Sequence, residues 1–176
     1  MKIEIMNEKF DPWQSLVDYK KNVLQNDPKI GATSVFMGTV RDFNDDEEVQ
    51  NMELEHYPGM TEKYLENIVN TAIKKYKIID GLVIHRVGLL EPTEPIVVVA
   101  SWSEHRENAF NATRDIMEAL KAEAPFWKKE STDNGIRWVE PTVGEESSSD
   151  EVYESCFSIF WWIRYIGNRQ MVIGKV

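Results

Sequence analysis

Three stretches of the chain place apolar residues at spacings of three and four, the pattern of a helix that buries one face. The predicted helices cover residues 12–26, 60–76 and 104–123. Asp11 and Pro12 supply an N-cap and a first-turn proline for the first helix, and Pro125 stops the third. We therefore expect three main helices, each packed on other elements through its apolar face.

Between the helices, shorter stretches are rich in β-branched and aromatic residues or alternate apolar with polar positions, as strands do. The predicted strands cover residues 31–41, 49–57, 81–88 and 96–103, with a hairpin formed by 127–132 and 136–140. Gly38 indicates a bulge or a close backbone approach, and Asn134-Gly135 supplies the hairpin turn. The acidic run 42–48 and the proline-containing run 89–95 are predicted to be connections.

This order of elements, roughly β-α-β-β-α-β-β-α-β-β, predicts an α+β fold in which helices pack against a largely antiparallel sheet. Residues 1–143 are the predicted folded domain, and residues 144–151 (GEESSSDE) a polar linker. The aromatic-rich segment 152–176 has three interpretations. It forms an extra strand that covers an edge or interface, it makes an interfacial membrane contact, or it is a terminal sequence of non-native origin.

Charge and cysteine content narrow the classes of function. Thirty acidic against twenty basic residues give a net charge of -10, which disfavours nucleic-acid binding because phosphates attract the opposite charge. Cys156 is the only cysteine, which excludes an intramolecular disulfide or a multi-cysteine zinc site and favours a reducing, cytoplasmic location. The sequence shows no secretory signal, transit peptide or 18-residue apolar run, so no membrane partner is expected.

Two histidine–arginine pairs are notable in this acidic chain: His85-Arg86 inside a predicted strand and His105-Arg106 at the start of the third helix. A helix N-terminus offers unpaired N–H groups and a partial positive charge, so His105-Arg106 is a candidate anion-binding site. The alternative for each pair is a structural one, in which both residues lie on the surface and are paired with nearby acids. The spacing favours neither interpretation.

Two lysines flank the end of the third helix. Lys121 lies in its last turn, and Lys128 follows in the run APFWKKE. Lysine suits general acid–base or nucleophilic roles because its pKa falls readily when the amine is desolvated. Taken alone, however, Lys121 is better explained as a helix-end charge that complements the dipole.

Further fixed charges and apolar residues complete the candidate set. Arg41 and Arg137 could bind a phosphate or a carboxylate, while Phe36 and Met37 either line an apolar wall or belong to the core. The sequence contains no phosphate-binding loop, dinucleotide-binding glycine motif, zinc-protease motif or nucleophile elbow. The residues by themselves therefore indicate an acidic α+β domain with a basic pocket.

A family resemblance takes the prediction further. The match covers roughly Lys2 to Pro141, and six strings carry it in order: VFMGTVRDFN, LEHYPGMTEKYL, VIHRVGLLEP, VVVASWSEHRENAF, IMEALKAEAPFWKKE and GIRWVE. Together they closely resemble the catalytic subunits of molybdopterin synthase. The resemblance implies an α/β-hammerhead type of fold and a homodimer within a heterotetramer.

The implied reaction moves sulfur from the C-terminal Gly-Gly thiocarboxylate of a small ubiquitin-like carrier protein onto cyclic pyranopterin monophosphate, which forms the dithiolene of molybdopterin. The substrate is an anion, in agreement with a basic pocket. Because other proteins insert molybdenum later, the resemblance implies no metal and no cofactor here.

The resemblance also assigns roles to individual residues. Lys121 and Lys128 match the family's catalytic lysines. The matching substrate-binding and pocket positions are Arg41, His105, Arg106, Phe36 and Met117, and Arg137 is added as a fixed charge of the hairpin. The mechanistic hypothesis is that Arg41, His105 and Arg106 hold phosphate and pterin oxygens while the two lysines assist proton transfer.

The chain departs from the family pattern at one functional position. Some relatives carry, just beyond the WVE string, an arginine that reaches the pocket of the dimer mate, whereas this chain has Pro141 and Thr142. A non-catalytic alternative is an anion-binding or scaffold domain that binds the carrier without turnover. The joint presence of the lysines and the basic residues favours the enzyme.

Overall fold

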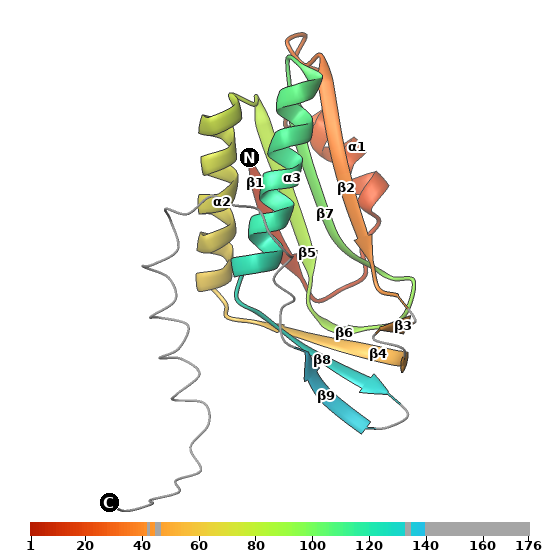
Figure 1. Ribbon diagram of the computed structural model, residues 1–176. Helices are drawn as coiled ribbons and strands as arrows, with labels where there is room; N and C mark the ends of the chain where they lie inside the picture. Colours follow the sequence, from red (N-terminus) through yellow and green to blue (C-terminus); the bar gives the residue numbers. More distant parts are fainter. Residues whose placement is uncertain (42, 45–46, 133–134, 140–176) are drawn as a thin grey trace, which may run out of the picture. The chain divides into compact units, whose positions relative to one another are not determined.

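The computed structural model describes residues 1–41, 43–44, 47–132 and 135–139. Within these residues, helices pack against two β-sheets (Figure 1). The helices are α1 (Pro12–Asn22), α2 (Met60–Tyr76) and α3 (Arg106–Glu123). This arrangement of helices on mixed and antiparallel sheets confirms the predicted α+β class.

The first sheet has the strand order β1-β5-β7-β2 (Figure 1). Its strands are β1 (Lys2–Met6), β5 (Asp80–Arg86), β7 (Pro95–Ser103) and β2 (Ala32–Thr39). β1 is parallel to β5, and the other two pairs are antiparallel. β2 is an edge strand of this sheet, and its register shifts between Gly38 and Thr39, which confirms the predicted bulge.

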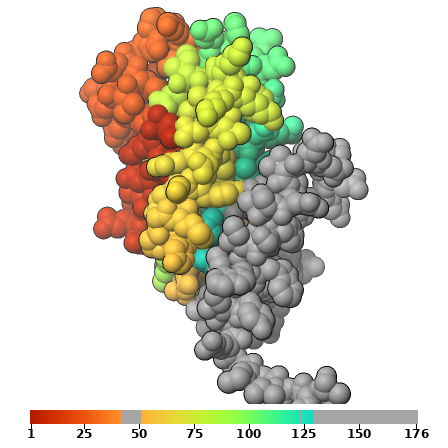
Figure 2. All heavy atoms as spheres, turned by 90° about the vertical axis from the view of Figure 1, so that its left-hand side faces the viewer, coloured from red at the N-terminus to blue at the C-terminus, as the bar shows by residue number. Residues whose placement is uncertain are grey.

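β5 and β7 are buried on both faces of the first sheet, which explains their almost continuous apolar sequence. One face packs against α2 and α3 in a group called here the α2–α3 cluster, whose members include Leu65, Val69, Val83, Val97, Val99, Ile116 and Leu120. The opposite face packs against α1 through Tyr19, Leu24, Leu82, Ile84, Val98, Ala100 and Trp102. In Figure 2, the yellow residues of α2 cover the first face beside the red residues of β1.

The second sheet has the order β3-β4-β8-β9, with β6 also paired to β4. Its strands are β3 (Phe43–Asn44), β4 (Glu47–His56), β6 (Gly88–Leu90), β8 (Phe126–Thr132) and β9 (Gly135–Val139). The chain turns from β5 into β6 at Gly88, whose φ of 84° is accessible mainly to glycine.

A third apolar group, called here the second-sheet cluster, links this sheet to the first. Its buried members are Val40, Met52, Leu54, Val87 and Leu90. Phe126 packs against both this cluster and the α2–α3 cluster. The end of α3, the start of β8 and the residue after β2 therefore share one continuous core.

The predicted helices are confirmed with small changes at their ends. Asp11 caps α1, since its carboxylate accepts hydrogen bonds from the N–H groups of Trp13 (2.8 Å) and Gln14 (3.1 Å). α1 ends four residues before the predicted boundary because Gln25 and Asn26 have positive φ values of 50° and 56°.

Two strands within the predicted connections were not foreseen. β3 and the first residues of β4 lie inside the acidic run 42–48, and Leu89 and Leu90 of β6 lie inside the run 89–95. These short strands form because β4 pairs with them: Met52 lies opposite Leu90, and Glu48 lies opposite Phe43. The β4–β6 pairing joins segments that are distant along the chain, and neither β3 nor β6 has enough residues to show a periodicity.

The hairpin of β8 and β9 is confirmed, with Thr132 opposite Gly135 in its antiparallel ladder. The turn residue Asn134 and everything from Glu140 onward, including Pro141, Thr142, the linker and the aromatic-rich segment, lie outside the described residues. The predicted domain boundaries at these positions stay predictions. Among the described residues, none of the helices is both long and apolar enough to cross a membrane.

Candidate active site

α3 lies alongside the edge strand β2, and both begin at the same end of the sheet (Figure 1). The N–H of Gly31 donates to the carbonyl of Ser103, just before α3, at 3.0 Å. Further along, the Thr113 hydroxyl bonds to the Ser101 hydroxyl at 2.7 Å and donates to the carbonyl of Ser34 at 3.5 Å. These buried contacts fix the helix against the strand.

Phe36 faces this seam between α3 and β2. It lies opposite Val99 in the ladder, and opposed residues of antiparallel strands share a face. Val99 belongs to the α2–α3 cluster, so Phe36 is on the helix-covered face at the sheet edge, where its side chain stays 41% exposed. A Cβ on Gly38 would lie 3.4 Å from the Phe36 ring, so the missing side chain leaves room for that ring.

Met117 and Lys121 continue the seam on α3. A spacing of four residues puts them on one face of the helix, one turn apart. Met117 is half-buried against the α2–α3 cluster, while Lys121 is exposed in the last turn. The contact between Thr113 and Ser34 gives a common starting point on α3 and β2. Met117 lies about 6 Å beyond Thr113 along the helix, and Phe36 lies about 7 Å beyond Ser34 along the strand. The two residues are therefore at about the same height along the seam.

A fixed corner joins Lys121 to Lys128. α3 ends at Glu123, the N–H of Phe126 donates to the carbonyl of Ala124 at 2.7 Å, and the Thr61 hydroxyl donates to the carbonyl of Pro125 at 3.3 Å. β8 begins at Phe126, so the short connection between the two lysines is held by these hydrogen bonds.

Lys128 differs from an ordinary surface lysine. It lies opposite the buried Leu54 and two residues beyond Phe126, so it shares their face of β8. Its side chain is only partly exposed. The face that carries Lys128 is therefore the one turned toward the core.

Arg41 follows Val40, which is buried in the second-sheet cluster together with Leu54. Leu54 is the ladder partner of Lys128, and Leu120, which precedes Lys121, lies in the α2–α3 cluster that Phe126 also joins. Each of the three cations is thus a neighbour, along the chain or in the ladder, of a residue in one of the two clusters that Phe126 joins. We call Arg41, Lys121 and Lys128 the basic end of the domain.

His105 and Arg106 lie at the other end of α3. His105 is the N-cap residue, and Arg106 is the first residue of the helix. Both side chains are exposed, and neither forms an ion pair within the described part of the chain. Fifteen residues separate Arg106 from Lys121, which is about 22 Å along a helix. One copy of the chain does not bring these predicted site residues together.

Arg137 is placed only through its backbone. β9 sets it opposite Glu130 in the ladder with β8. Its side chain is not among those described, so its predicted role stays a prediction.

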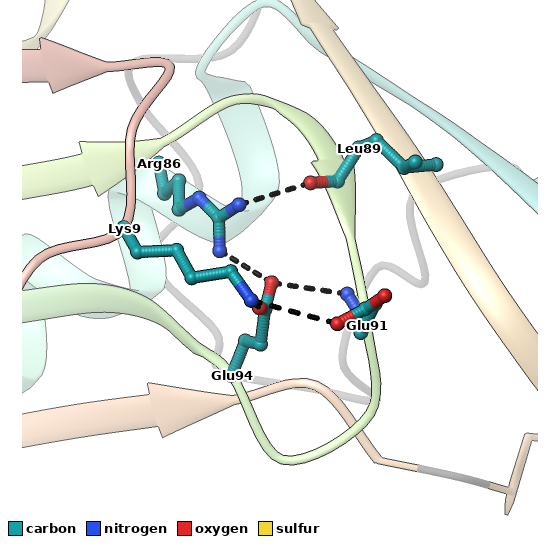
Figure 3. Close-up of polar contacts among 5 residues, drawn as sticks. All are labelled: Lys9, Arg86, Leu89, Glu91 and Glu94. Atoms are coloured by element: carbon teal, nitrogen blue, oxygen red, sulfur yellow. Dashed lines mark hydrogen bonds and ion pairs between the residues drawn. The ribbon is translucent and has the colours of Figure 1, made fainter.

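The other pair, His85-Arg86, is structural, but the predicted surface pairing with acids is wrong: both residues are buried, and of the two only Arg86 is paired with an acid among the described residues. His85 is 5% exposed, its Nδ1 lies 2.8 Å from the carbonyl of Arg86, and burial lowers its pKa to about 4, so the ring is neutral. Arg86 is paired with the buried carboxylate of Glu94 (Figure 3). The sequence signal for that partner is the acidic run EPTEP, which becomes meaningful once β5 and β7 are known to be neighbours.

Comparisons with known proteins identify the family of the chain. Residues 6–123 match the family model described as MoaE protein. The chain belongs to the MoaE family. It is 59% identical over 119 residues to the molybdopterin synthase catalytic subunit of Ralstonia nicotianae, covering 68% of each chain. With that of Pseudomonas aeruginosa it shares 46% identity over 150 residues, or 85% of this chain and 97% of the relative.

Solved structures of MoaE proteins have the same fold. The molybdopterin biosynthesis MoaE protein from Burkholderia ambifaria is 42% identical, with a TM-score of 0.67 over 92% of this chain and 97% of that one. Molybdopterin synthase from Staphylococcus aureus is 30% identical, with a TM-score of 0.70 over 80% and 98% of the two chains. The predicted family is thus confirmed, and with it the class of enzyme, a molybdopterin synthase catalytic subunit in molybdenum cofactor biosynthesis.

Proposed function

We propose that this MoaE-family chain transfers sulfur from the thiocarboxylated Gly-Gly terminus of a small ubiquitin-like carrier protein to cyclic pyranopterin monophosphate, which yields the dithiolene of molybdopterin. The observation that carries the proposal is the basic end. Lys121 and Lys128 are held on either side of a fixed corner, and Arg41 adjoins the same core. In a chain of net charge -10, such a grouping of cations suits an anionic substrate.

Each residue of the basic end has a proposed task. Arg41 holds the phosphate or a pterin oxygen through charge-assisted hydrogen bonds. Lys121 and Lys128 assist proton transfer as the thiocarboxylate sulfur attacks a side-chain carbon of the pterin and displaces an oxygen substituent, and as water then cleaves the carrier's acyl C–S bond and leaves its terminus as a carboxylate. Phe36 and Met117 form the apolar wall beside the lysines, where they exclude water and strengthen these interactions.

A second copy of the chain is proposed to complete the site. His105 and Arg106 are exposed, lie at a helix N-terminus and are about 22 Å from Lys121 along α3. If they bind the same substrate, they must come from the partner in a symmetric dimer, where each copy contributes one end of α3 to each site. Two catalytic chains and two carriers would then form the heterotetramer.

The carrier is proposed to enter as an extended peptide, because a Gly-Gly terminus fits a channel too narrow for side chains.

A solved complex of subunits 1 and 2 of molybdopterin-converting factor from Helicobacter pylori shares the fold, at 21% identity and a TM-score of 0.66. The single cysteine of this chain supports a cytoplasmic site of reaction.

Single-turnover conversion tests the proposal. The purified protein is mixed with thiocarboxylated carrier and cyclic pyranopterin monophosphate, and the product is read as pterin fluorescence after oxidation. Molybdopterin should appear with two sulfurs transferred for each product. If the carrier binds in a pull-down and no product forms, the scaffold alternative is correct; if neither occurs, the proposed reaction is wrong.

A further inference from the structure

A buried ion pair closes the connection between β6 and β7 (Figure 3). Arg86, at the end of β5, donates through Nη1 to Oε2 of Glu94 and through Nη2 to the carbonyl of Leu89 at 3.0 Å. The same Oε2 accepts the N–H of Glu91 at 3.1 Å. Lys9, from the segment after β1, binds the other carboxylate oxygen. One carboxylate therefore ties together three parts of the chain.

The turn that this carboxylate holds is strained. The N–H of Glu94 donates to the carbonyl of Glu91 at 3.2 Å, with Pro92 and Thr93 between them. Thr93 has a φ of 73°, which β-branched residues rarely adopt and which glycine would normally supply in such a turn. Such a conformation persists only where the surrounding structure enforces it.

The strained 91–94 turn also holds Val40, the residue that precedes Arg41 of the basic end. The N–H of Thr93 donates to the carbonyl of Val40 at 2.8 Å, and the N–H of Val40 donates to the carbonyl of Glu94 at 3.0 Å. The regular ladder of β2 ends one residue earlier, opposite Pro95, which has no N–H to donate. These two hydrogen bonds are therefore the backbone anchor immediately before Arg41.

We propose that Glu94 is a positioning residue for the sulfur-transfer site: through the 91–94 turn and Val40, its buried ion pair with Arg86 holds Arg41 where the substrate's anion binds. This inference rests on the proposed function of Arg41. Net stabilisation alone is a weak reason for burying such a pair, because desolvation largely offsets the attraction between the charges. The pair does supply orientation, since an apolar side chain at position 94 could not accept the N–H of Glu91.

A double-mutant cycle tests the link between Glu94 and Arg41. The variants are Glu94→Gln, Arg41→Ala and both together. Asp115→Asn is the matched control. Asp115 of α3 likewise binds a lysine (Lys75, 2.8 Å) and a second side chain, and both of these partners belong to α2, away from the basic end. Glu94→Gln should raise KM for the pterin about tenfold with carrier affinity unchanged. In the Arg41→Ala background it should have no further effect, whereas Asp115→Asn should leave KM unchanged in either background.

Amide hydrogen exchange gives a readout that does not depend on turnover. Exchange at Val40 and Thr93 should be at least about tenfold faster in Glu94→Gln than in the native chain, and unchanged in Asp115→Asn. If Glu94→Gln does not fold because Arg86 is left unpaired, Arg86→Met combined with Glu94→Gln removes both charges and should give the same results.

Two outcomes would overturn the inference. One is unchanged exchange at Val40 and Thr93 when the ion pair is removed. The other is a loss of activity from Glu94→Gln that is as large without Arg41 as with it. If the native chain forms no product at all, the proposed function fails instead, and the exchange measurement still decides whether the ion pair holds the segment before Arg41.

Discussion

The imidazole of His85 stacks on the ring of Phe126, with ring centroids 4.2 Å apart and planes inclined by 21°. His85 lies near the end of β5 in the first sheet, and Phe126 begins β8 in the second. The stack therefore joins the two sheets two residues from Lys128. A neutral histidine suits this role because it packs as an aromatic ring while its Nδ1 bonds to the carbonyl of Arg86.

This stack predicts a pH-dependent stability. In the folded chain, burial and the nearby His56 lower the pKa of His85 to about 4, whereas the unfolded chain keeps the ordinary 6.5. Between pH 6.5 and 4, His85 is therefore protonated in the unfolded state and neutral in the folded state. The free energy of unfolding should fall by up to about 3 kcal/mol between pH 6.5 and 4.

Denaturant unfolding at pH 7, 5.5 and 4.5 measures this effect. His85→Phe keeps a stacking ring and removes the titration, so the loss of stability over this range should shrink. His105→Gln, at an exposed position, should not change it. An undiminished pH dependence in His85→Phe would show that other groups are responsible.

Lys121→Ala should lower the rate of dithiolene formation by about 10²- to 10⁴-fold, the range for loss of a general acid–base group, and leave carrier binding intact. The control is Lys74→Ala, because Lys74 is also an exposed lysine in the last turn of a helix, α2. Single-turnover rates and a carrier pull-down measure the two effects. Equal rates for the two variants would mean that Lys121 only complements the helix dipole.

Mixing two inactive variants tests whether the site is shared between copies. Lys121→Ala and Arg106→Ala should each be inactive alone. In a mixture allowed to exchange subunits, about half of the dimers are hybrids and each hybrid has one intact site, so about a quarter of the native activity should return. No recovery would mean that Arg106 and Lys121 do not meet across a dimer.

Gly38→Ala should disturb the apolar wall. Its Cβ would lie 2.9 Å from Cγ1 of Val97 and 3.4 Å from Cε1 of Phe36, so one of these side chains must move. We expect a loss of about 1–3 kcal/mol of stability, as for other overpacked sites, together with weaker pterin binding. Thr33→Ala, at an exposed position of the same strand, is the control. Native stability and affinity in Gly38→Ala would mean that the wall adapts freely.

Local patterns in the sequence predicted the helices well. Met60–Tyr76 is a long amphipathic stretch whose buried face alone defines it, and Asp11 is an N-cap whose hydrogen bonds lie within three residues. β3 and β6 were missed because strands of two and three residues are too short to show a periodicity, and β6 also depends on a partner, β4, that is distant in sequence.

For the site, the family resemblance identified the lysines, and helix geometry alone could have warned that Arg106 lies far from Lys121. The status of His85 and Arg86 could not be predicted in this way. Whether a histidine–arginine pair binds a ligand or is buried depends on its neighbours, here Phe126 and Glu94, which lie 41 and 8 residues away along the chain. Only the pairing of β5 with β7, and the packing of β8 beneath them, brings those neighbours into contact.

The parallel pairing of β1 with β5 also affects how the chain folds during synthesis. Lys2 lies opposite Leu82, so β1 cannot join the sheet until about eighty more residues have been made. β2 must likewise wait for β7. Pairings between such distant segments form slowly because a long loop must close first. During this interval the apolar sides of both strands are open to chaperones or to other nascent chains.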